Sequence, residues 1–388
     1  MQVVSFGLAA LYSGMWCLRW ARGGGWEGAW GQLGLFSSTL CVGSVVGAVA
    51  WGANIQNNAF QYEAQVRFDI IPQQGYALFA TSLRFASVFV ILYGFEFLCL
   101  VMCKLMLLGR LATSAGQSSP TDVPEMSGVR RRWLTVSGRA LPNVYRVMAG
   151  AVVVGSVVGM VADAVAGAYG VQQAGLMYQA AGACDAAGND TNSSLAFFNA
   201  ANVISTKAST AQSVQSSSEA LTLLIVSVAF LAIVSWSSAL FRMLERFSAR
   251  VLLQFTLNDR GNIPAHEANV ARIVADAMQA AAEHQRRLTA ACVIVLVTFP
   301  ARVAFDLLNA YADFNDPFNN DCSQCEPCQS TRILINTWLI YTPEFQPIVV
   351  AVSSPLPLTL SLWLLTKFVA RARLIAADVE RAHVGDGV

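Results

Sequence analysis

The sequence predicts an all-α polytopic membrane protein, a seven-transmembrane helix bundle with its N-terminus outside or lumenal and its C-terminus cytoplasmic. Three observations lead to this fold class. Hydrophobic residues make up 55% of the 388-residue chain. They gather into seven stretches of the length that crosses a bilayer, where a helix satisfies its own backbone hydrogen bonds. The basic residues collect in alternate connections between these stretches, as expected of cytoplasmic loops.

Each predicted span is a mostly apolar run close to the roughly 20 residues that cross the hydrocarbon core. The spans are 2–17, 33–52, 79–108, 144–169, 220–240, 288–310 and 347–368. Together they form one membrane domain, 1–388. Its larger connections are a mobile cytoplasmic loop (109–141), a glycosylatable outer loop (170–218), a cytoplasmic helical hairpin (243–287), a Cys-rich outer loop (311–346) and a cytoplasmic tail (369–388).

The orientation follows from the positive charges, because Lys and Arg are retained on the cytoplasmic side. Only Arg67, Arg84, Lys207 and Arg332 fall on the opposite side, and Arg302 falls inside a span. The cytoplasmic set holds 20 of the 25 basic residues: Arg19, Arg22, Lys104, Arg110, Arg130, Arg131, Arg132, Arg139, Arg146, Arg242, Arg246, Arg250, Arg260, Arg272, Arg286, Arg287, Lys367, Arg371, Arg373 and Arg381.

The predicted outer loops carry features that require the lumenal side. Asn189 and Asn192 each begin an Asn-x-Ser/Thr glycosylation site. Thiolates spaced like those of the outer cysteines can also bind a metal ion, but the oxidising side and the lack of a nearby histidine favour disulfides. The sequence therefore predicts two disulfides, in any of three connectivities, and no metal site. The four cysteines are Cys184, Cys322, Cys325 and Cys328.

Four charged residues fall inside the predicted spans, where each needs a partner or a water-filled cavity. They are Glu96, Asp163, Arg302 and Asp306. Arg302 and Asp306 are four residues apart on one helix and are expected to pair. Glu96 is expected to be protonated or bound to Arg302. Two interpretations follow: a structural clamp between the third and sixth spans, or a site for a polar ligand or ion.

Small residues recur in two spans at a spacing that permits close helix packing. The run Gly-Ser-Val-Val-Gly occurs at 43–47 and again at 155–159. Small residues four apart let helix backbones approach closely in lipid. We expect both runs to lie inside the bundle.

Several function classes find no support in the sequence. The formal net charge of +1 does not indicate nucleic-acid binding. The three histidines, His266, His284 and His383, lie far apart, and no catalytic or phosphate-binding motif occurs. The last span also lacks the Asn-Pro-x-x-Tyr run of G-protein-coupled receptors. The sequence therefore predicts neither an enzyme nor a cofactor.

Short motifs in the later spans resemble plant tobamovirus-multiplication proteins, a seven-helix membrane family. They are Leu-Phe-Arg-Met-Leu-Glu-Arg-Phe at 240–247, His-Gln-Arg-Arg-Leu at 284–288, Arg302 before Asn-Ala-Tyr at 309–311, Glu96 after Gly-Phe, and Ser-Ser-Pro at 353–355. Asn309 replaces an acidic residue of the family. The resemblance implies a scaffold on vacuolar or other endomembranes that recruits a cytoplasmic protein, with Glu96 and Arg302 in the polar centre of the bundle.

Two functional hypotheses follow. The first is a receptor-like or scaffold protein of the secretory pathway, in the plasma membrane or a vacuolar or other endomembrane. It would present Arg242, Arg246, Arg286 and Arg287 to a cytoplasmic protein partner. The alternative is a transporter or channel that uses the intramembrane polar residues, or a structural subunit of a membrane assembly. The sequence does not indicate an oligomeric state.

Overall fold

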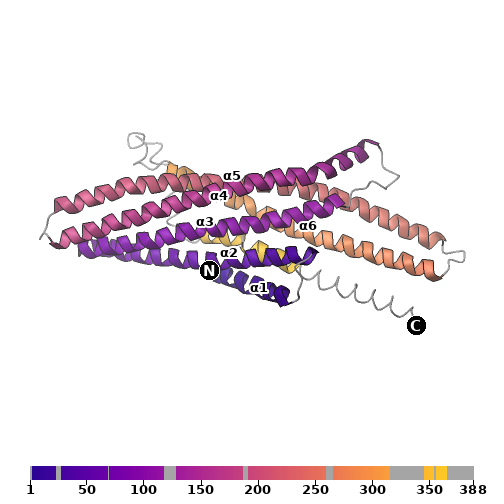
Figure 1. The fold of residues 1–388 in the computed structure, drawn as a ribbon, viewed down its shortest axis with the longest axis horizontal. Helices are drawn as coiled ribbons and strands as arrows, with labels where there is room; N and C mark the ends of the chain where they lie inside the picture. The colour runs from indigo at the N-terminus through magenta and orange to yellow at the C-terminus, as the bar shows by residue number, and fades with distance from the viewer. Residues whose placement is uncertain are drawn as a thin grey trace. The chain divides into compact units, whose positions relative to one another are not determined.

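The computed structural model describes residues 2–22, 28–68, 70–117, 128–186, 191–258, 265–314, 345–353 and 355–364. Apart from a short turn at 70–71, all of these residues are helical, and they include no strand (Figure 1). The helices are α1 (Gln2–Arg22), α2 (Gly28–Phe68), α3 (Pro72–Gln117), α4 (Gly128–Ala186), α5 (Thr191–Asn258), α6 (Ala265–Phe314) and α8 (Phe345–Ser353), followed by helical residues 355–364. The prediction of an all-α chain is confirmed.

Five helical segments within these residues are long and apolar enough to cross a membrane. They are Leu33–Phe68, Pro72–Thr113, Asn143–Cys184, Ser193–Trp236 and Arg286–Tyr311, and a shorter apolar stretch lies at Ile348–Leu364. Such helices characterise an integral membrane protein, with the lipid bilayer as its environment. The count of seven spans, which includes α1, and the orientation of the termini stay predictions.

The helices extend well beyond the predicted spans. The segment 170–218, predicted to be an outer loop, is helical in α4 up to Ala186 and in α5 from Thr191. The described parts of the predicted mobile loop, 109–117 and 128–141, are also helical. Ala is the commonest residue of these extensions, and alanine has the highest helix propensity. Those of α4 and α5 pack together with α3 in a hydrophobic cluster of Ala80, Ala174, Met177 and Ala201.

The described helices belong to two compact units. Unit 1 consists of Met1–Cys103, Gly150–Ile225 and Thr298–Leu356. Unit 2 consists of Lys104–Ala149, Val226–Val297 and Pro357–Val388. Within unit 2, Tyr145 Oη donates a hydrogen bond to the Leu105 carbonyl at 2.9 Å, which joins α4 to α3. Ser361 Oγ donates one to the Ala291 carbonyl at 3.4 Å, which joins the last helical stretch to α6.

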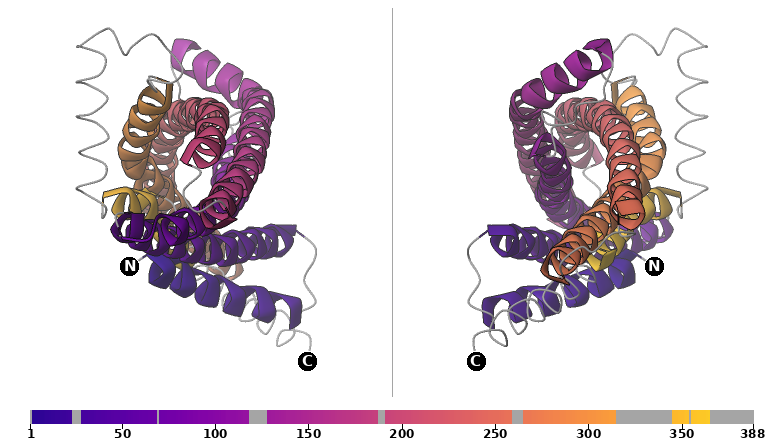
Figure 2. Two further views of the ribbon diagram at one scale, coloured as in Figure 1. Left: turned by 90° about the vertical axis from the view of Figure 1, so that its left-hand side faces the viewer. Right: turned by 90° about the vertical axis from the view of Figure 1, so that its right-hand side faces the viewer.

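Within unit 1, α1 lies along α2, and glycines of α2 permit the close contact (Figure 2). A methyl group added at Gly47 would lie 2.6 Å from the ring of Phe6 on α1. One added at Gly43 would lie 2.8 Å from Cys99 on α3. The second glycine-containing run behaves in the same way, because Ser218 of α5 donates a 2.7 Å hydrogen bond to the Gly155 carbonyl of α4. Both runs pack as the sequence predicts.

Candidate functional site

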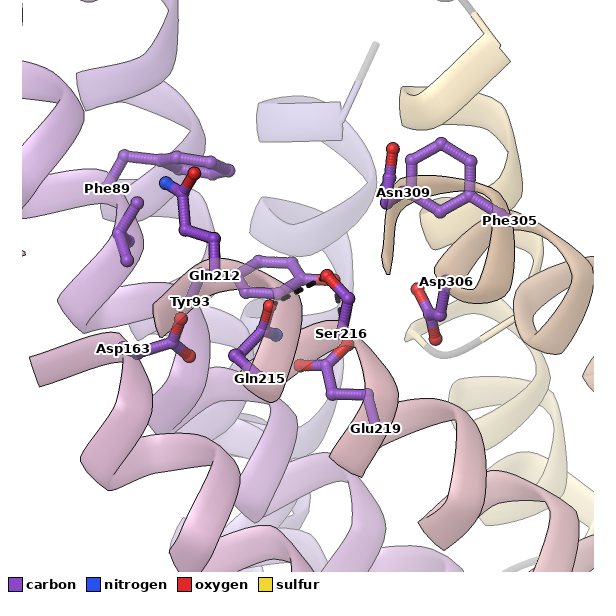
Figure 3. A pocket seen from close by; sticks show the side chains of 11 residues that line it. Phe89, Tyr93, Asp163, Gln212, Gln215, Ser216, Glu219, Phe305, Asp306 and Asn309 are labelled. Atoms are coloured by element: carbon purple, nitrogen blue, oxygen red, sulfur yellow. Dashed lines mark hydrogen bonds between the residues drawn. The ribbon is translucent and has the colours of Figure 1, made fainter. Parts of the chain in front are cut away.

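A cavity of about 180 Å³ lies inside unit 1, lined by residues of α3, α4, α5 and α6. Figure 3 shows carboxyl groups from three different helices around this space. Asp163 comes from α4, Glu219 from α5 and Asp306 from α6. The other lining residues are Phe89, Val90, Tyr93, Gln212, Gln215, Ser216, Phe305 and Asn309. Polar and aromatic side chains therefore surround a cavity in a unit whose helices are predominantly apolar.

Helical periodicity brings these side chains to the cavity. On α5, Gln212, Gln215 and Ser216, and Glu219 follow one another at intervals of three or four residues. Side chains at this spacing lie on one face of a helix. The lining residues of α6 and of α3 have the same spacing, so a single stripe of each of these three helices forms the wall.

Arg302 of α6 joins two of these carboxyl groups, those of Glu219 and Asp306. Its Nη2 donates a hydrogen bond to Glu219 Oε2 at 3.2 Å, and its Nε donates one to Asp306 Oδ2 at 3.2 Å. Its guanidinium lies 5.3 Å from the centroid of the Tyr93 ring. Tyr93 Oη in turn donates to Glu219 Oε2 at 3.3 Å. Arg302 therefore joins α6 to α5 by an ion pair and to α3 by a cation–π contact.

Two of the cavity's carboxyl groups keep a buried oxygen without a hydrogen bond. Asp163 is 2% exposed, and its Oδ2 has no hydrogen-bond partner within the described residues. Glu219 is also 2% exposed, and its Oε1 has none there either. Buried polar atoms in proteins are nearly always hydrogen-bonded, so each exception calls for an explanation.

The charges around the cavity are unequal. Three carboxyl groups line it, while the ion pairs of Arg302 within the described residues are with two of them, Glu219 and Asp306. Asp163 and Asp306 both act electrostatically on Glu219. Uncompensated charge is costly in a membrane interior, so the cluster needs further positive charge or protons. The arrangement is suited to binding a cation.

The charged residues that the sequence places inside the spans do not all lie at the cavity. Asp163 and Asp306 line the cavity, and Arg302 forms the ion pair with Asp306 that their spacing predicts, at 3.2 Å. Glu96 is buried but does not line the cavity; its carboxyl carbon would lie 3.0 Å from a methyl group added at Gly47 of α2. The ion pairs of Arg302 within the described residues are with Glu219 and Asp306, so the Glu96–Arg302 clamp stays a prediction.

Glu219 is the residue that the sequence interpretation missed. The predicted fifth span begins one residue later, and the polar run before it was assigned to an outer loop. In the structure α5 continues through this run, and Glu219 accepts the Arg302 hydrogen bond. A signal was available, since Gln212, Gln215, Ser216 and Glu219 recur at helical spacing.

The other site residues predicted from the sequence lie away from the cavity or outside the part of the chain that the structure describes. Arg286 is exposed, and Arg287 forms an ion pair with Glu283 one turn earlier on α6. No described cysteine is in a disulfide, including Cys184. The backbone positions of Arg242, Arg246 and Asn192 are helical, but their side chains lie outside the described part. Asn189, Cys322, Cys325, Cys328 and the tail 369–388 lie outside the described residues altogether.

The chain matches no protein-family model, no curated protein and no solved structure. The resemblance to tobamovirus-multiplication proteins therefore depends on the short motifs of the later spans. The geometry of the cavity is the basis for a proposed function.

Proposed function

We propose that this protein is a membrane transporter with an intramembrane binding site for a small cation. The observation that carries the proposal is Asp163, a buried carboxyl group that lines the cavity and whose Oδ2 has no hydrogen-bond partner within the described residues. A charged or strongly polar group in a membrane interior that lacks a protein partner usually marks a substrate or ion pathway. The side-chain oxygens of Gln212, Gln215 and Asn309 add uncharged acceptors around the same space.

The sign of the charge favours a cation over an anion. Arg302 already donates to Glu219 and Asp306, so the basic group of this cluster is engaged with carboxylates. An anion in the cavity would face three carboxyl groups at once. A cation that meets Asp163 would instead reduce the excess of negative charge around the cavity, which is costly in a membrane interior.

Asp163→Asn should abolish most cation uptake by the protein in sealed proteoliposomes. Asparagine preserves the size of the side chain but removes its charge, so we expect at least about a tenfold lower rate, equivalent to roughly 1.4 kcal/mol of lost interaction. The measurement is uptake of radioactive sodium, rubidium and methylammonium by wild-type and variant vesicles. At least one of these should enter wild-type vesicles faster than protein-free ones.

Glu63→Gln is the matched control, because Glu63 is a half-exposed carboxylate of α2 that pairs with Arg67 and does not line the cavity. It should leave uptake unchanged. Uptake by Asp163→Asn at the wild-type rate, or wild-type rates equal to those of protein-free vesicles for every cation, would contradict the proposal.

A second candidate function, a receptor-like or scaffold protein, is favoured by the length of α5 and α6. Their predicted spans end at 240 and begin at 288, yet α5 continues to Asn258 and α6 starts at Ala265. These continuations lie almost entirely within the segment 243–287, which the sequence predicts to be a cytoplasmic helical hairpin. Rigid helices outside the lipid would give a cytoplasmic partner a fixed surface to bind. The tobamovirus-multiplication-like motifs at 240–247 and 284–288 lie at the ends of these two predicted spans.

If the hairpin binds a partner, changing Arg242, Arg246 and Arg286 together to alanine should reduce its capture at least about tenfold by removing three charges. The measurement is quantitative mass spectrometry of proteins cross-linked to the full-length chain in its native membrane. The matched control changes Arg130, Arg131 and Arg132, which are basic residues of α4. An equal loss of the same partner in both triple variants would argue against a specific hairpin surface.

A further inference from the structure

We infer that the cavity recognises a small organic ammonium ion, in which a protonated amine meets Asp163 while its carbon skeleton lies against aromatic rings. This inference rests on the proposed function and specifies the chemical class of the cation. Three properties of the described residues support it: the spacing of the carboxyl groups, the aromatic lining and the size of the cavity.

The carboxyl groups are not arranged as metal ligands. A bare metal ion such as Ca²⁺ requires six to eight oxygen atoms at about 2.3–2.6 Å. Within the residues that the structure describes, no three Asp, Glu, His or Cys side chains converge closely enough to hold a metal ion. Asp163 instead stands across the cavity from Glu219 and Asp306, so it is available to a ligand that makes one charged hydrogen bond (Figure 3).

Aromatic rings supply the second part of the site. Phe89, Tyr93 and Phe305 all line the cavity, and the Phe89 and Tyr93 rings are 5.6 Å apart. Organic ammonium ions are bound in proteins by aromatic faces together with a carboxylate. Tyr93 already makes this kind of contact with the guanidinium of Arg302. Phe89 makes no such contact with a cation among the described residues, so its ring can meet a ligand in the cavity. Phe305 adds a third ring to the lining.

The size of the cavity agrees with this class. Its volume of about 180 Å³ exceeds the space that a single dehydrated ion occupies. An apolar cavity of about 150 Å³ is enough to hold benzene. The cavity therefore accommodates a ring or short alkyl group bearing one ammonium group, with the amide and hydroxyl groups of Gln212, Gln215 and Ser216 as further hydrogen-bond acceptors.

The test is equilibrium binding of radiolabelled benzylammonium to the full-length protein in lipid nanodiscs. Benzyl alcohol, which has nearly the same shape but no charge, should compete at least about tenfold more weakly. Asp163→Asn should lower benzylammonium affinity at least about tenfold. Phe305→Leu should lower it about three- to tenfold, because an aliphatic side chain gives no cation–π contact.

Phe60→Leu is the matched control, because Phe60 stacks on Phe85 at 5.6 Å and does not line the cavity. It should leave affinity unchanged. The ligand class is overturned if benzyl alcohol competes as well as benzylammonium, if Phe60→Leu weakens binding as much as Phe305→Leu, or if calcium displaces the label more effectively than methylammonium does.

The outcome also separates this inference from the proposed function. Asp163-dependent benzylammonium binding without cation flux in proteoliposomes would support the ligand class and contradict transport. Asp163-dependent sodium flux without benzylammonium binding would support transport and overturn the organic ammonium ligand.

Discussion

Replacing Arg302 with alanine is expected to lower the free energy of unfolding by about 3–5 kcal/mol, the usual cost of removing one partner of a buried ion pair. Arg302 is 3% exposed and provides the positive charge between Glu219 and Asp306. Without it, both carboxylates stay buried among further acidic groups. The measurement is reversible denaturation of the purified protein in mild detergent, followed by intrinsic fluorescence.

Arg67→Ala is the control for loss of an arginine ion pair as such. Arg67 pairs with Glu63 at 3.0 Å, and its side chain is 44% exposed. Exposed pairs contribute about 0–1 kcal/mol, so this variant should remain close to wild type. Combining Arg302→Ala with Glu219→Gln and Asp306→Asn should recover part of the loss, because the triple variant no longer buries the two uncompensated charges. Equal stability of the two single arginine variants would refute the central role of Arg302.

Hydropathy predicted where the helices lie but not where they end. The first six predicted spans each fall within a described helix, because a bilayer-crossing segment needs a long run of apolar residues. The described residues of the seventh, 347–353 and 355–364, are helical as well. Hydropathy is insensitive to a helix that continues beyond the lipid. The extensions of α4 and α5 are stabilised by helix propensity and by packing in the cluster that contains Ala174 and Ala201. Such packing joins distant parts of the chain, so local hydropathy does not reveal it.

Contacts at the candidate site could be predicted only where they join residues that are close in the sequence. The Arg302–Asp306 pair follows from four-residue spacing on one helix, and charge inside a span marked Asp163 as unusual. The Arg302–Glu219 pair joins positions 83 residues apart, and no local pattern specifies it. Glu96 shows the same limit. It lies one turn after Tyr93 yet sits beside Gly47 of α2, while Tyr93 lines the cavity.

The contact between Gly94 of α3 and Asp163 of α4 leads to the second large effect. A methyl group added at Gly94 would overlap Asp163 Oδ2, the same oxygen that has no hydrogen-bond partner within the described residues. Gly94→Ala must therefore displace the carboxyl group or separate the helices. We expect cation uptake to fall at least about tenfold and the free energy of unfolding to drop by about 1–3 kcal/mol, as for overpacked cores. Uptake and denaturation are measured on the same preparation.

Gly150→Ala separates this clash from the general effect of replacing a helical glycine. Gly150 lies on α4, the helix of Asp163, and a methyl group there would meet no atom within 4 Å. Because alanine is favoured over glycine inside a helix by about 0.5–1 kcal/mol, this variant should be slightly more stable and fully active. If Gly94→Ala behaved like Gly150→Ala in both assays, the close approach of α3 and α4 would not position Asp163. If it lost stability but kept full uptake, Asp163 would not need its observed position for transport.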